Sequence, residues 1–134
     1  MNTKKFKNII LFQVFLTFAL AIKAIFFPYS LAPEELTKAI IAYDDLQPLP
    51  DLFTSVFLLI FIILSIISLI MLFKLKKFGR TLYSIAIAGS FLIVFSVNYF
   101  VYDPLELFLE SGITLISGLI IGLAYFSNIN KSFK

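Results

Sequence analysis

The feature that most constrains this chain is the run from Leu52 to Phe73, which contains no charged residue, proline or glycine. As an α-helix that rises about 1.5 Å per residue it is roughly 33 Å long, which matches the hydrocarbon core of a bilayer. The run stops abruptly at a basic cluster, Lys74, Lys76, Lys77 and Arg80. It predicts a transmembrane helix, and its scarcity of small and polar residues predicts a wall of the protein that faces lipid.

The composition of the whole chain supports a membrane protein. Of its 134 residues 60% are hydrophobic and 14% are charged, and the mean hydropathy is +1.01. Globular domains carry about 25% charged residues. A soluble domain of this length could not bury so much apolar surface, so we expect the lipid bilayer to be its main partner.

Three further apolar runs have lengths that suit a membrane span. The predicted fold is therefore an all-α integral membrane protein in one domain, residues 1–134, with four antiparallel transmembrane helices and one short amphipathic outer helix. The four spans are predicted at about residues 8–28, 52–73, 81–102 and 105–127, and the outer helix at about 33–44.

The first apolar run follows Lys4, Lys5 and Lys7, as expected for a first span whose N-terminus is cytoplasmic. A cleaved signal peptide is the alternative, because Ala19-Leu20-Ala21 has the form of an A-x-A cleavage site. The apolar character continues to Phe27, which favours a span.

The first predicted helix has two unlike faces. Its small and polar face is expected to meet other helices, and its phenylalanine-rich face is expected to meet lipid. The first face holds Gln13, Thr17, Ala21 and Ala24; the second holds Phe12, Phe15, Phe18 and Phe26.

The connection over residues 29–50 is acidic and contains a helix start. Pro33 followed by Glu34 and Glu35 suits the first turn of a helix, since proline is tolerated there and carboxylates favour the positive end of the dipole. We expect the outer helix to cap the ends of the spans; binding of a partner is the alternative. Asp51 is placed to cap the second span.

The last predicted span begins with Asp103-Pro104-Leu105-Glu106, an Asp cap with proline at the first helical position and an acid in capping-box spacing. Along it, small and polar residues share one face, and Gly118 and Gly122 form a G-x-x-x-G motif. This helix-packing face could meet other helices of the same bundle or a second copy in a homodimer. Its residues are Ser111, Thr114, Gly118, Gly122 and Tyr125. A short polar tail, residues 128–134, follows.

The charges predict the orientation. Nine of the eleven basic residues lie before residue 8, between residues 74 and 80, or after residue 130, and these segments hold no acid. All eight acids lie in residues 34–51 and 103–110. The positive-inside rule then places both termini in the cytoplasm. Orientation also accounts for the net charge of +3 without a nucleic-acid partner.

Lys23 and Glu110 are the two charges within predicted spans. Both lie about 7 Å from the outer ends of their helices at 1.5 Å per residue, so they could form an ion pair. Ionisable groups in a span suggest function, and a ligand or partner site or an ion pathway would involve Lys23, Glu110, Gln13 and Thr17. The alternative is structural, because a lysine so close to the interface can also extend to the headgroups.

The chain contains no cysteine and no histidine. It therefore lacks disulfides, imidazole ligands and a Ser-His-Asp triad. The adjacent acids Glu34-Glu35 and Asp44-Asp45 suit a solvated edge better than a metal site, which needs about six spaced oxygen ligands. We predict no enzyme activity, no metal and no cofactor.

Two stretches carry a resemblance. Gly79-Arg80-Thr81-Leu82-Tyr83 and the segment from Gly118 to Ser127 resemble small four-helix bacterial inner-membrane proteins of uncharacterised function, mainly over residues 74–133. This resemblance implies a bacterial cytoplasmic membrane and no particular activity. The chain is also similar in size to small multidrug-resistance transporters, but it has Gln13 and Thr17 where they place an essential glutamate in the first helix.

Three functions remain as hypotheses. The first is a non-enzymatic membrane protein that acts through protein-protein contact, as an accessory subunit or an immunity-type protein, with a protein partner or as a homo-oligomer. The second is a small homo-oligomeric transporter or channel. The third is a lipid-modifying enzyme, which would require carboxylates that converge at the outer face.

Overall fold

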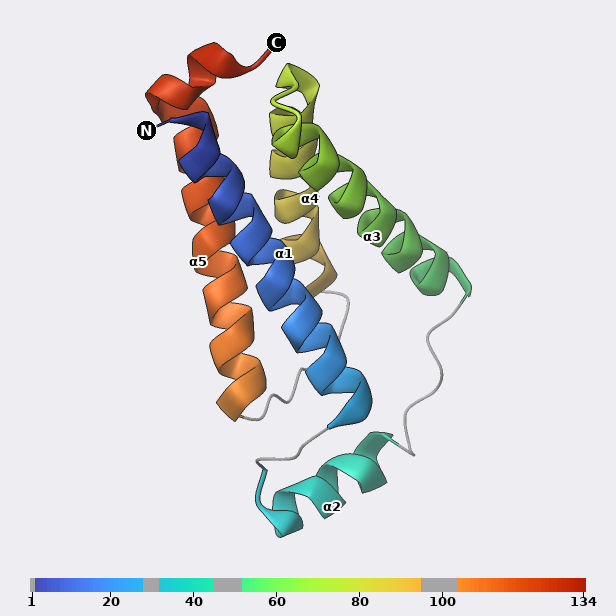
Figure 1. Ribbon diagram of the computed structural model, residues 1–134. Coiled ribbons are helices and arrows are strands. Elements are labelled where there is room, and N and C mark those ends of the chain that lie inside the picture. The colour runs from blue at the N-terminus through green and yellow to red at the C-terminus, as the bar shows by residue number, and fades with distance from the viewer. Residues whose placement is uncertain (1, 28–31, 45–51, 95–103) are drawn as a thin grey trace.

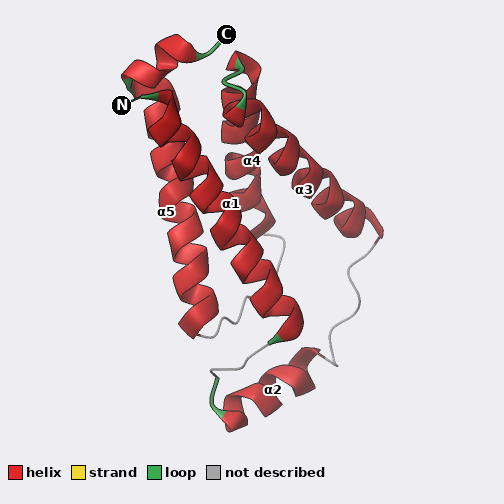
Figure 2. Cartoon of the chain, viewed as in Figure 1, coloured by secondary structure: helices red, strands yellow, loops and turns green. Residues whose placement is uncertain are grey.

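The computed structural model describes residues 2–27, 32–44, 52–94 and 104–134. These segments contain helices and no β-strand, which confirms the all-α fold class (Figure 2). The helices are α1 (Thr3–Phe26), α2 (Glu34–Asp44), α3 (Leu52–Phe73), α4 (Lys77–Val94), α5 (Pro104–Phe126) and the 3₁₀ helix η1 (Asn128–Ser132).

The bounds of α3 and the start of α5 at Pro104 agree closely with the expected helices, but α1 and α4 begin earlier. Asn2 caps α1, because its side chain accepts a hydrogen bond of 3.0 Å from the backbone N–H of Lys5. The basic segment that was expected to be a loop supplies the first turn of α4 instead. The expected caps Asp51 and Asp103 and the end of the third predicted span lie outside the described residues.

The four long helices form two neighbouring pairs (Figure 1). α1 packs along α5, and α3 packs along α4. Both chain ends and the α3–α4 turn lie at one end of the bundle, which we call the terminal end; α2 lies beyond the opposite end, the far end. α3 leans away from α1 toward the far end, so the two pairs meet mainly near the terminal end.

The turn between α3 and α4 takes only three residues. The backbone N–H of Lys76 donates to Met71 O at 3.0 Å and that of Leu75 to Leu72 O at 2.9 Å, while Leu75 has φ 55°. This is a Schellman cap with leucine in the left-handed position that glycine usually occupies. Gly79 then lets α4 approach α3, since a Cβ there would lie 2.6 Å from Met71 Cβ.

The buried core sits in the terminal half of the bundle. It combines side chains of all four long helices with two from the C-terminal segment. Phe6 and Phe133 meet edge to face, with ring centroids 5.9 Å apart. The core cluster consists of Phe6, Ile10, Leu72, Tyr83, Ile120, Ala124, Ile129 and Phe133.

The C-terminal segment differs from the expected polar tail. It folds back as η1, and Ile129 and Phe133 enter the core. The backbone of Lys134 also pairs with the α3–α4 turn: its N–H donates to Leu75 O and its carbonyl accepts from Lys77 N, both at 2.9 Å. The spacing of the two apolar residues in residues 128–134 explains the difference: they stand four positions apart, so both side chains can be buried while the polar ones between them stay outside.

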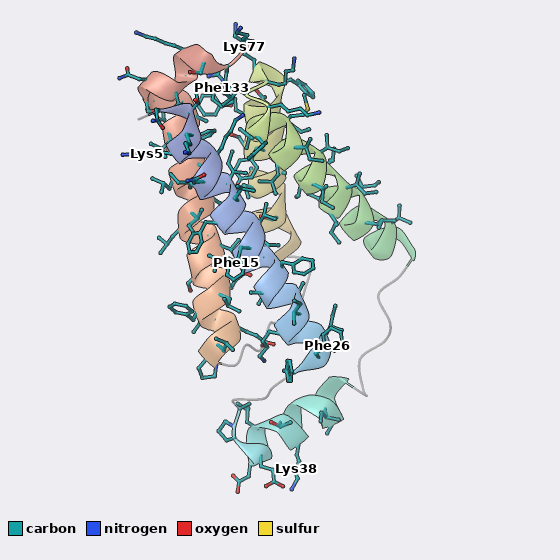
Figure 3. The ribbon with its side chains drawn as sticks, viewed as in Figure 1. Lys5, Phe15, Phe26, Lys38, Lys77 and Phe133 are labelled. Atoms are coloured by element: carbon teal, nitrogen blue, oxygen red, sulfur yellow. The ribbon has the colours of Figure 1, made fainter. Side chains whose placement is uncertain are left out.

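Many large apolar side chains of the described helices remain exposed. α1 and α5 are each long and apolar enough to cross a membrane, as judged by length and composition. The phenylalanine face of α1 is exposed as expected, with Phe15 at 65% and Phe26 at 69% (Figure 3). α3 likewise exposes a row of isoleucines, among them Ile62, Ile66 and Ile70.

The outer helix α2 forms close to its predicted bounds but does not cap the bundle. It makes no contact with the other helices in the described part of the chain. Glu34 and Lys38 form an exposed ion pair at 2.7 Å, and Leu36 and Ile41 are exposed as well. Its apolar side is thus available to a surface other than the bundle.

Candidate functional site in the bundle interior

A chain of direct hydrogen bonds joins three helices in the interior. The Tyr83 hydroxyl on α4 donates to Gln13 Oε1 on α1 at 2.7 Å. Gln13 Nε2 donates in turn to Ser117 Oγ on α5 at 2.8 Å, and the Ser117 hydroxyl donates to the carbonyl of Ile113 at 2.8 Å. All three side chains are buried, at 2–4% exposure.

Regular helical spacing brings these groups together. On α1 the buried residues Phe6, Ile10 and Gln13 follow one another at steps of four and three residues, and Lys23 is buried further along the helix. Residues at these steps lie on one side of a helix. Ser117 stands in a similar stripe on α5, three residues before Ile120. The polar side chains therefore occupy core positions between apolar ones.

The chain of bonds holds helices together and carries no net charge. Amide, hydroxyl and phenol groups are uncharged at neutral pH, and here each donor meets an acceptor at ordinary hydrogen-bond distance. Interhelical bonds of this kind contribute on average about 0.6 kcal/mol each in membrane proteins. They select one rotation of each helix, because any other would leave a polar group in an apolar core.

A buried ion pair forms a second polar site nearer the far end. Lys23 Nζ on α1 lies 3.0 Å from Glu106 Oε1 on α5, and the two side chains are 6% and 10% exposed. Lys23 stands in the last turn of α1 and Glu106 in the first turn of α5. The lysine therefore lies at the negative end of the α1 dipole and the glutamate at the positive end of the α5 dipole. Both charges are stabilised by these helix ends.

The partner of Lys23 in this pair is Glu106 and not Glu110, the partner considered from the sequence. The two acids are four residues apart and share one side of α5, but only Glu106 lies level with Lys23. Glu110 is half-buried one turn further along. Lys23 also does not extend to the surface, since its side chain is 6% exposed.

The other proposed binding residues divide between interior and surface. Gln13 is buried at the centre of the network, whereas Thr17, one turn later, is exposed and donates to the carbonyl of Gln13 at 3.0 Å. The expected small face of α1 is therefore only partly an interface. Ala21 and Ala24 are exposed as well, although Ala24 lies about three turns after Gln13 on the same side of α1.

The helix-packing face expected on α5 is rotated out of this bundle. Ser111, Thr114 and Gly118 are exposed, and a Cβ at Gly118 or Gly122 would meet nothing within 4 Å. Tyr125, at the end of this face, packs against the core cluster. Ser117, adjacent to Gly118 in sequence, makes the contact with α1 instead.

Arg80 anchors the C-terminal segment, a role that was not expected. Its guanidinium donates to the carbonyl of Ala124 at 3.3 Å and to Asn130 Oδ1. It also lies 4.9 Å from the ring centroid of Tyr125 and 5.4 Å from that of Phe133. A cation at the end of α5 satisfies a terminal carbonyl and favours the helix dipole.

Tyr83, Ser117 and Glu106 were likewise not singled out as site residues. Helical spacing from buried apolar residues of the same helix could have identified them, as with Ser117, which stands three residues before Ile120.

In the described segments no three acidic, histidine or cysteine side chains gather as metal ligands would. Comparisons with protein-family models, curated proteins and solved structures find no match to the chain.

Proposed function

We propose that the protein is a bacterial inner-membrane protein that crosses the membrane four times, with both termini and the α3–α4 turn in the cytoplasm. The terminal end carries nine of the eleven basic residues, and the described acids belong to α2 and to the first two turns of α5, toward the far end (Figure 1). This distribution supports the orientation through the positive-inside rule. α2, with exposed leucine and isoleucine and a charged face, then lies in the outer interface.

Single-cysteine labelling tests this topology, because the chain has no cysteine of its own. In intact cells a maleimide that cannot cross the membrane should label Lys38→Cys on α2. It should label Lys131→Cys in η1 only after the cells are permeabilised. Labelling of both sites in intact cells, or the reverse order, would contradict the orientation.

Within this topology we propose that the protein acts through contact with another membrane protein or a second copy, as an accessory subunit or an immunity-type protein. One contrast on α5 carries the proposal. The polar side chains that face the bundle are engaged by direct bonds, as at Ser117, whereas Gly118 and Gly122 on the neighbouring face have open space above them. A small-residue face permits close approach of another helix.

A cross-linking experiment in native membranes tests the contact. Gly122→Cys should form a disulfide-linked or reagent-linked species whose mass shows whether the partner is identical or different. Gly118→Ile should abolish that species, because its side chain fills the space. Ala88→Ile places the same isoleucine side chain at an exposed small residue of α4 and should leave the cross-linked species unchanged. An equal effect of both substitutions, or no cross-linked species, would overturn the proposal.

A small transporter or channel is the second candidate. Buried polar groups at two levels of the bundle favour it. Lys23 and Glu106 form a buried ion pair, and Gln13 is buried about 15 Å from Lys23 along α1, at 1.5 Å per residue. In this reading Gln13, Thr17, Lys23 and Glu110 lie along the path. Proteoliposomes with purified protein would then show ion or solute flux that Glu106→Gln changes; we expect no flux above protein-free vesicles.

A further inference from the structure

An apolar groove of about 210 Å³ runs between α1 and α3 near the terminal end. Leu11 and Val14 of α1 and Ile70 and Phe73 of α3 line it, and Lys74 lines it just after the end of α3. Apolar cavities of about 150 Å³ accept a molecule the size of benzene, so this groove has room for a segment of a hydrocarbon chain.

The groove opens to the side of the bundle. Its walls belong to α1 and α3, two helices that diverge toward the far end (Figure 1). Leu11 and Ile70 are 53% and 50% exposed although they line it, so neither helix closes it. A ligand could therefore enter from the surrounding lipid without any rearrangement of the core.

One end of the groove is cationic. Lys74 belongs to its lining, and Lys7 Nζ lies 4.9 Å from the ring centroid of Phe73, which also lines it. The chain has no acid before Glu34 or between residues 52 and 102, so no carboxylate from these segments neutralises the two ammonium groups. The groove thus joins an apolar slot to a positive mouth.

We propose that this groove binds one acyl chain of an anionic phospholipid, with the lipid phosphate at Lys7 and Lys74. The inference rests on the proposed membrane orientation, which brings these lysines to the cytoplasmic headgroups. Anionic lipid is favoured over zwitterionic lipid because a choline or ethanolamine cation would face the same ammonium groups. Each lysine near an anionic surface contributes about 1 kcal/mol, or about a fivefold change in affinity.

Native mass spectrometry of the full chain in detergent tests the proposal. The protein is titrated with dioleoyl phosphatidylglycerol and, in parallel, with dioleoyl phosphatidylcholine. One phosphatidylglycerol should bind at least tenfold more tightly than phosphatidylcholine. The double variant Lys7→Gln/Lys74→Gln should lose most of this preference, whereas Lys131→Gln in the exposed part of η1 should keep it.

A second pair of variants tests whether the acyl chain occupies the apolar lining of the groove. Ile70→Trp fills the groove and should weaken binding of both lipids, whereas Ile62→Trp, at a 57% exposed position of α3 outside the lining, should not. Both replaced side chains are already half exposed, so the core remains intact. Glycerol 3-phosphate alone should bind far more weakly than the intact lipid.

Several results would overturn the inference. Equal affinity for the two lipids, an equal effect of Lys131→Gln, or binding of glycerol 3-phosphate as tight as that of lipid would each do so. A dimer in detergent that Ile70→Trp dissociates would assign the groove to a second copy. Labelling that contradicts the topology overturns the proposed function, whereas correct labelling with no lipid preference overturns only the groove.

Discussion

Lys23 and Glu106 form an ion pair of 3.0 Å that ties the last turn of α1 to the first turn of α5. At the other end of the same two helices, Phe6 packs against Phe133 of the C-terminal segment. The first and last long helices are thus held together at both ends, by charge at the far end and by apolar burial at the terminal end. Removal of either clamp should loosen the α1–α5 pair at that end of the bundle.

Glu106→Gln should destabilise the protein by about 3 kcal/mol, because it removes one charge of an ion pair whose side chains are 6% and 10% exposed. Glu110→Gln, one turn away on the same helix, should change the stability by less than about 0.5 kcal/mol. The free energies come from SDS titration of the detergent-solubilised protein followed by far-UV circular dichroism. The double variant Lys23→Met/Glu106→Leu should recover most of the loss. Equal losses for the two glutamates would show that the pairing is wrong.

Tyr83→Phe should cost about 1 kcal/mol, since it removes the donor to Gln13 and keeps the ring in the core. Gln13→Leu should cost a similar amount, and the two losses should not add. The double-mutant cycle should give a coupling of about 0.6 kcal/mol, the average for interhelical hydrogen bonds in membrane proteins. Ser90→Ala on the exposed side of α4 serves as the control. Strict additivity would mean that the two groups do not interact.

Gly79→Ala and Gly118→Ala add the same methyl group to two helices with different surroundings. At Gly79 the methyl carbon would lie 2.6 Å from Met71 Cβ and 2.7 Å from the Met71 carbonyl carbon, so α3 and α4 must separate at a cost of about 1–3 kcal/mol. At Gly118 the methyl carbon meets nothing within 4 Å. The better helix propensity of alanine should therefore raise the free energy of unfolding by at most about 1 kcal/mol. Thermal unfolding of the dilute monomer in detergent measures both. A loss at Gly118 as large as that at Gly79 would argue against this packing.

Phe133→Ala should destabilise the terminal end by about 3 kcal/mol, because Phe133 is buried at 3% exposure and packs against Phe6 and Arg80. Phe126→Ala removes the same side chain at a 91% exposed position and should have little effect. Hydrogen exchange adds a local readout. The amide of Lys134, which donates to Leu75 O, should exchange much faster in Phe133→Ala than in Phe126→Ala. Unchanged protection of this amide would show that the tail is held by other contacts.

The helices themselves could be predicted from the sequence because they depend on local properties. The apolar run Leu52–Phe73 matches α3, and Pro104 begins α5 because proline suits a first turn. The start of α4 at Lys77 was missed since a basic segment is equally compatible with a loop and with a first helical turn. Burial of Phe133 was missed because the polar residues around it dominate the composition of the tail.

The partners inside the bundle were decided by the tertiary structure. Helices that are apolar on nearly every side give little indication of their rotation, so the sequence could not choose between Glu106 and Glu110 or between Ser117 and Gly118. One residue turns a helix by about 100°, and four residues shift a side chain by about 6 Å along the axis. Only the packing of α1 against α5 and α4 selects the rotation that pairs Lys23 with Glu106 and joins Gln13 to Tyr83 and Ser117. The sequence by itself determined which segments are helices and where their charges lie, and the tertiary structure determined which side chains meet.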